Sequence, residues 1–150
     1  MTDPAAGGTG AGLQGTYRVR LFRPALDDAR RLVPRKKDLM VLRSHALKLR
    51  FWPRHPSPDA PLLDMDWDWI RALKGHDIGE LRIADRIGGN DNLRVVFYKG
   101  DPQVRRPLPI IWIVAVVQKK RMDWTAHQLS VFRSRRTLID ERYYVNREFI

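Results

Sequence analysis

The chain has 150 residues, of which 43% are hydrophobic, and this is enough apolar sequence for one domain with a buried core. Its 28 Lys and Arg residues outnumber 17 Asp and Glu residues and give a net charge of +11. Such a charge indicates an anionic partner: nucleic acid, an acidic protein or an anionic membrane surface. The sequence contains no cysteine, which excludes disulfides and thiolate metal sites.

The longest apolar run, Ile110 to Val117, is the length of a strand and far short of the roughly 20 residues of a membrane helix. The amino terminus lacks the basic and apolar blocks of a signal peptide. The four histidines have no metal-ligand spacing. We therefore expect a cytoplasmic protein that uses no metal or cofactor and does not enter a membrane.

Residues 1–15 are rich in Gly and Ala, which predicts a disordered tail before a single domain over residues 16–150. Alternating apolar and basic residues predict a first strand over 17–22. A helix is expected to begin at Pro24, with Asp27 and Asp28 near its positive end. Apolar spacings of three and four predict a second helix over 35–49.

Four prolines between residues 51 and 61 predict a surface loop, part of a Pro-rich insertion around 51–63. Three aspartates at 64, 66 and 68 then suggest a short helix closed by Gly75. On such a helix Trp67 and Trp69 would point to different sides. One of them is a candidate for stacking on a base, with core packing as the alternative.

Residues 78–87 and 93–99 are predicted strands joined around the Gly88-Gly89-Asn90-Asp91 turn, and 110–117 is a predicted central strand. The last helix is expected to start after Asp123, as N-cap residue, and to run to about Tyr144. These elements predict an α+β fold in which N-terminal helices and a C-terminal helix pack on a small antiparallel sheet.

Cations gather at the ends of these elements. Arg82, Arg86 and Arg94 are placed to converge on one sheet face, where guanidinium groups bind phosphate, and a solvated strand face is the alternative. A triplet of Lys119, Lys120 and Arg121 closes the apolar strand. Arg133 and Arg136 continue the positive charge on the last helix. Together they predict a groove for a polyanion.

His127 lies near this end of the chain and is a candidate for proton transfer, although a surface helix residue is the alternative. The sequence has no Ser/His/Asp triad, no P-loop and no acidic cluster placed for a divalent metal. Any activity is therefore expected to be metal-free.

The order GELRI, a Gly/Asn turn, NLRVVFYK, an apolar strand ending in KKR and a basic helix resembles the RelE/HigB-type toxins of bacterial toxin–antitoxin modules. The resemblance covers residues 17–33 and 78–144. It implies a RelE/ParE-like fold and a small endoribonuclease that cleaves mRNA in the ribosome without metal. In that chemistry the 2′-hydroxyl attacks the adjacent phosphate while fixed cations stabilise the developing charge.

Residue by residue, the resemblance places Arg82, Arg94, Lys120 and His127 in the catalytic centre, with Lys119 as an alternative to Lys120 and Tyr143 or Tyr144 as alternatives to His127. It implies further RNA contacts from a second set of cations: Arg86, Lys119, Arg121, Arg133 and Arg136. Two departures stand out: Ala84 occupies a position where ribosome-dependent members often carry lysine, and residues 34–70 form an insertion.

The leading hypothesis is therefore an mRNA-cleaving toxin with mRNA and the ribosome as partners, restrained by an acidic antitoxin that covers the basic groove. On this hypothesis Arg94→Ala abolishes toxicity and leaves the fold intact. The alternatives are a non-catalytic relative that binds RNA, DNA or the ribosome, and a ParE-like inhibitor of DNA gyrase.

Overall fold

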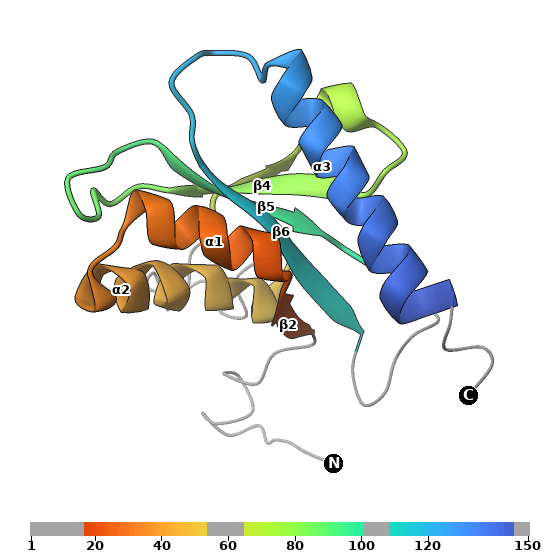
Figure 1. Ribbon diagram of the computed structural model, residues 1–150, viewed down its shortest axis with the longest axis horizontal. Helices are drawn as coiled ribbons and strands as arrows, with labels where there is room; N and C mark the ends of the chain where they lie inside the picture. The colour runs from red at the N-terminus through yellow and green to blue at the C-terminus, as the bar shows by residue number, and fades with distance from the viewer. Residues whose placement is uncertain (1–16, 54–64, 101–108, 146–150) are drawn as a thin grey trace.

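Five strands form one sheet in the computed structural model, which describes residues 17–53, 65–100 and 109–145 (Figure 1). Their spatial order is β2-β6-β5-β4-β3. The strands are β2 (Arg18–Leu21), β3 (Trp67–Trp69), β4 (Ile78–Ile83), β5 (Leu93–Tyr98) and β6 (Ile110–Gln118). The predicted tail and most of the Pro-rich insertion lie outside the described residues.

Three α-helices accompany the sheet in the described ranges, which confirms the predicted α+β class. They are α1 (Arg23–Leu32), α2 (Lys36–Ala46) and α3 (Ala126–Ile139). Short 3-10 helices follow α2 and β3, and a π-helical segment extends α3; these are η2 (Leu47–Phe51), η4 (Arg71–Leu73) and η5 (Asp140–Val145). None of the helices in the described ranges is long and apolar enough to cross a membrane.

The sheet is mixed. β4, β5 and β6 pair antiparallel, as predicted, and β3, which was not predicted as a strand, pairs antiparallel to β4; β2, however, pairs parallel to β6. The expectation of a wholly antiparallel sheet is therefore wrong at this edge. Strands joined by a tight hairpin must be antiparallel, whereas the long connection from β2 to β6, which includes α1 and α2, permits the parallel arrangement.

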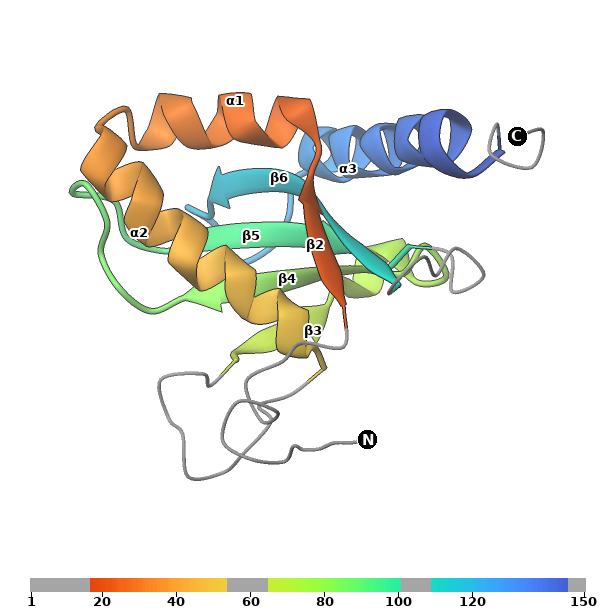
Figure 2. The same cartoon turned by 90° about the horizontal axis from the view of Figure 1, so that it is seen from below.

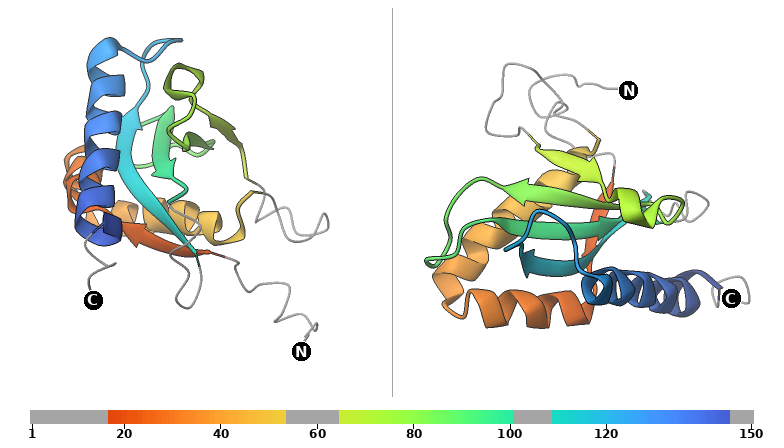
Figure 3. Two further views of the ribbon diagram at one scale, coloured as in Figure 1. Left: turned by 90° about the vertical axis from the view of Figure 1, so that its right-hand side faces the viewer. Right: turned by 90° about the horizontal axis from the view of Figure 1, so that it is seen from above.

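Each face of the sheet buries a separate core. On one face, α1 and α2 pack against alternate residues of the strands, among them Leu81, Val95 and Ile113. On the other face, α3 buries Phe132 and Ile139 with the apolar side chains of β5 and β6 that point the opposite way. Figure 2 shows α2 crossing the first face, and Figure 3 shows α3 running along the β6 side.

The helix predicted over residues 64–74 is wrong: Trp67–Trp69 is the edge strand β3, and only one 3-10 turn follows it. The alternation of Trp with Asp has the period of a strand, and β4 offers an edge to pair with. Trp67 and Trp69 consequently lie on the same face. Their rings pack with Trp52 and Phe97 at centroid distances of 5.1 to 6.3 Å.

The start of α3 is also corrected. Thr125, not Asp123, is the N-cap: its hydroxyl accepts from the Gln128 amide N–H, and the Gln128 side chain accepts from the Thr125 N–H. A Thr followed three residues later by Gln is a capping box, which satisfies two backbone donors at once. The regular α-helix ends at Ile139.

A buried ion pair connects α1, β6 and α3. Asp28 is 7% exposed, and its carboxylate accepts from Arg135 at 2.6 Å and from the backbone N–H of Val116 at 3.2 Å. Arg135 also donates to the carbonyl of Val114 at 3.0 Å. β2 pairs with β6 only as far as Ile113. Asp28 and Arg135 therefore provide hydrogen-bond partners for the backbone groups of β6 that lie beyond the end of β2.

We predict that Asp28→Asn lowers the free energy of unfolding by about 3–5 kcal/mol, because it leaves the Arg135 charge buried without its partner. Asp27→Asn is the matched control, since among the described residues Asp27 makes only an exposed ion pair, with Arg23 at 3.7 Å, and the variant should change stability by less than about 1 kcal/mol. Urea unfolding of both variants checks this. Equal losses would contradict it.

His45 of α2 contacts Asp85, just after β4, at 3.1 Å. Burial lowers the pKa of His45 below its ordinary value of 6.5; Lys48 adds to the lowering and Asp85 opposes it. The unfolded chain therefore binds the proton at a higher pH than the folded protein does. The stabilisation that this difference provides is complete above pH 6.5 and is lost as the pH falls through the lowered pKa.

We therefore predict that the wild-type protein loses more stability than His45→Gln between about pH 7.5 and about pH 5.5. Urea unfolding at the two pH values measures the difference. A decline of the same size in both proteins would show that His45 does not contribute to it.

Candidate nucleic-acid interface

Two of the predicted arginines are cross-strand neighbours. The register places Arg82 of β4 directly opposite Arg94 of β5, and both project from the sheet face that α3 packs on. Like charges in this position repel each other. Each is offset by a carboxylate: Arg82 pairs with Asp66 at 2.9 Å, and Arg94 pairs with Glu80 at 3.0 Å.

Glu80 is the central acidic residue of this face. It is 5% exposed, and each carboxylate oxygen has a donor: Arg94 Nε to Oε1 at 3.0 Å and Trp124 Nε1 to Oε2 at 3.0 Å. The Trp124 ring is itself positioned against Phe132 of α3, with ring centroids 5.2 Å apart. The carboxylate is therefore fixed by donors from β5 and from the loop before α3.

A cavity of about 360 Å³ opens over Glu80. Its lining includes Trp69 and Arg71 on the β3–η4 side and Lys119 and Trp124 on the side of the loop between β6 and α3. Asp68 and Asp123 also line it, so the cavity carries charges of both signs. The Glu80 carboxylate at its floor therefore suits hydrogen-bond donors such as ribose hydroxyls, while Arg71 and Lys119 in its lining suit an anion.

Three consecutive cations, Lys119, Lys120 and Arg121, follow β6, and the first of them lines the cavity. Lys119 lies on the Trp124 ring, with Nζ 4.8 Å from the ring centroid. Lys120 and Arg121 are exposed, and neither has an ion-pair partner in the described part of the chain. These two side chains can therefore accept a phosphate without breaking a contact within the protein.

The remaining predicted residues lie at different places. His127 is exposed in the first turn of α3 and does not line the cavity, although Trp124 and Leu129 do. Arg86 is exposed between β4 and the turn, and Arg133 is exposed on α3. Arg136 serves the fold: it donates to the His76 carbonyl at 2.7 Å and pairs with Asp140 at 3.2 Å.

The side chains of Tyr143 and Tyr144 are outside the described set. Glu80, Trp124 and Arg71 were not predicted. Glu80 could have been found, because strand periodicity puts it on the same face as Arg82, two residues later. Within the described ranges, no group of three or more His, Cys, Asp or Glu side chains is arranged to hold a metal ion.

The expectation that Arg94→Ala leaves the fold intact does not fit the Glu80–Arg94 pair, because removal of Arg94 leaves a buried carboxylate without its ion-pair partner. We predict that Arg94→Met destabilises the fold by about 3–5 kcal/mol at neutral pH and that adding Glu80→Gln recovers part of the loss.

Urea unfolding of the two single variants and the double variant at about pH 7 gives these values. A double variant whose loss of stability equals or exceeds the sum of the two single losses would contradict the pairing.

Comparison of the chain with protein-family models, curated proteins and solved structures finds no match in any of the three. The functional interpretation consequently depends on the fold and on the geometry of this face.

Proposed function

We propose that this protein is a toxin of the RelE/HigB type, an endoribonuclease that cleaves translated mRNA at the ribosome in the cytoplasm and is restrained by an acidic antitoxin. One observation carries the proposal: the buried Glu80 carboxylate, fixed by Arg94 and Trp124, lies under a cavity that Lys119 lines, and the next two residues, Lys120 and Arg121, are exposed and have no ion-pair partner in the described ranges. A fixed base beside unpaired cations is what metal-free RNA cleavage requires.

In the proposed reaction, Glu80 accepts the proton of a ribose 2′-hydroxyl. A carboxylate has about four lone-pair positions, and Arg94 and Trp124 use two of them, so Glu80 keeps capacity to accept a further proton. The 2′-oxygen forms a bond to the adjacent phosphorus, and the bond from phosphorus to the 5′-oxygen breaks. Lys120 and Arg121 stabilise the charge that develops on the phosphate oxygens.

The leaving 5′-oxygen needs a proton, and His127 is the proposed donor. Its position in the first turn of α3, close in sequence to the cavity residues Trp124 and Leu129, supports this role. Arg82 and Arg94 then act through position more than through free charge: Arg94 orients the base, and Arg82 contributes its half-exposed guanidinium to the same face.

A non-catalytic RNA-binding protein is the second candidate. The observation that favours it is that both strand arginines are already paired with carboxylates of the protein itself. Binding would then depend on the cations of the loop after β6 alone and would weaken steeply with salt, without cleavage products.

Induced expression in bacteria without a partner protein tests the proposal, with pulse labelling to follow protein synthesis and mapping of mRNA ends. We predict rapid translation arrest and new ends inside coding regions. Glu80→Gln should abolish both, because it keeps the size of the side chain and removes the base. Lys120→Ala should slow cleavage by about tenfold or more.

Arg30→Ala is the charge-matched control for Lys120→Ala, since Arg30 is an exposed cation on α1, and it should leave the arrest unchanged. Full activity in a folded Glu80→Gln protein would eliminate Glu80 as the base. Intact mRNA and normal growth with soluble wild-type protein would favour the RNA-binding candidate. DNA damage signalling without translation arrest would instead favour gyrase inhibition.

A further inference from the structure

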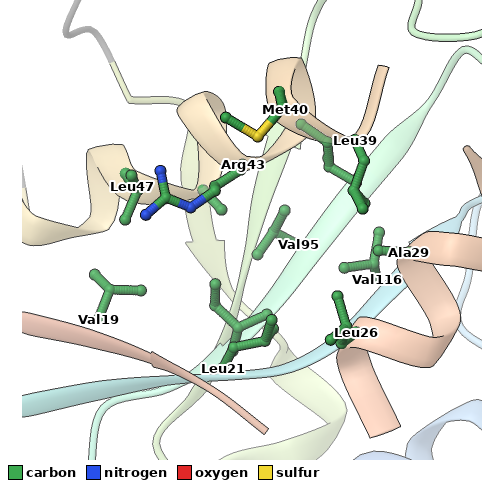
Figure 4. A pocket seen from close by; sticks show the side chains of 13 residues that line it. Val19, Leu21, Leu26, Ala29, Leu39, Met40, Arg43, Leu47, Val95 and Val116 are labelled. Carbon is green, nitrogen blue, oxygen red and sulfur yellow. The ribbon is translucent and has the colours of Figure 1, made fainter. Parts of the chain in front are cut away.

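A second hollow lies on the opposite face of the sheet from Glu80. It has a volume of about 350 Å³ and separates α2 from β2 and α1 (Figure 4). Val95, Ile113 and Val116 form its floor, and alternation along β5 places Val95 on the other side of the sheet from Arg94. The walls are almost wholly apolar: Val19, Leu21, Leu26, Ala29, Leu39, Met40, Leu42, Ala46 and Leu47.

Large apolar side chains remain exposed at both walls of this groove. Leu21 of β2 is 45% exposed and Met40 of α2 is 51% exposed. In Figure 4 the two face each other across the opening. Apolar side chains that gather around a hollow in this way mark a surface that gains free energy by being covered.

The charge around the groove selects its occupant. Arg43 is the charged residue of the lining and has no ion-pair partner within the described ranges. α2 further carries Lys36 and Lys37 in its first turn, against a single carboxylate on that helix, Asp38. A second copy of this chain, at a net charge of +11, would bring like charges together. An acidic partner would be attracted.

The walls favour a helix over an extended peptide. An extended peptide that joined the sheet as a further strand would need free backbone groups along the edge of β2. η2 lies beside the start of this edge, where the Tyr17 N–H donates to the Arg50 carbonyl at 3.2 Å. The groove side of α2 and the first residue of η2 present Leu39, Arg43 and Leu47 at spacings of four residues, a length of about 12 Å. A helix offers side chains at i, i+4 and i+7 over about the same length.

We propose that this groove is the docking site for an acidic amphipathic helix of a partner protein, which inserts two or three aliphatic side chains between α2 and β2 while its carboxylates meet Arg43 and the cations at the start of α2. The volume is at the lower end of the roughly 300–1,000 Å³ of ligand pockets, so it suits side chains and not a whole folded element. The inference does not depend on nuclease activity, because the groove and Glu80 are on different faces.

A displayed library of helical peptides of about 18 residues provides the test. Three positions, i, i+4 and i+7, vary among aliphatic residues, and the outward positions vary among Glu, Ala and Lys. Selection on the full-length protein should enrich Glu over Lys. A selected peptide should bind Met40→Glu and Arg43→Glu about tenfold or more weakly than wild type.

Leu138→Glu is the matched control, because Leu138 is 42% exposed on α3, away from the groove, and binding to this variant should stay within about twofold of wild type. Circular dichroism of each variant establishes that it is folded. Three results would overturn the proposal: no selected binders, binders rich in Lys, or binders that tolerate Met40→Glu. A wild-type dimer in sedimentation that Met40→Glu dissociates would also overturn it, since the occupant would then be a second copy.

Discussion

The structure depends on how the backbone hydrogen-bonding groups along the uncovered edge of β6 find partners. β6 has nine residues and its parallel neighbour β2 has four, so the later half of β6 lacks a strand on that side in the described chain. Asp28 and Arg135 bind its backbone at Val116 and Val114 instead. The Asp28–Arg135 ion pair thereby fixes α1 and α3 against the central strand.

The candidate interface follows from a second electrostatic constraint. Two arginines opposite each other on adjacent strands would repel, and a buried carboxylate would be costly alone; together, Arg94 and Glu80 stabilise each other. Trp124 completes the arrangement from the loop before α3. The same pair keeps Arg94 from being a free phosphate ligand, whereas Lys120 and Arg121 are exposed and have no ion-pair partner in the described ranges.

Much of the fold could be predicted from local patterns. Alternation and apolar runs located β2, β4, β5 and β6, Pro24 located the start of α1, and spacings of three and four located α2. β3 was missed because its aspartates resemble a helix start, although the Trp–Asp alternation and the edge of β4 favour a strand. Contacts between residues distant in the chain could not be predicted. Asp28 was expected to interact favourably with the dipole of its own helix, whereas its contact with Arg135 forms only when α3 packs against the sheet.

The most direct test of the proposed function is the chemistry of the RNA ends made by the purified protein on translating ribosomes. Attack by the 2′-hydroxyl leaves a 2′,3′-cyclic phosphate on one fragment and a 5′-hydroxyl on the other, and we expect both within coding sequence. Fragments with 3′-hydroxyl ends, or intact mRNA in the presence of saturating protein, would contradict the assignment of Glu80 and the loop cations to RNA cleavage.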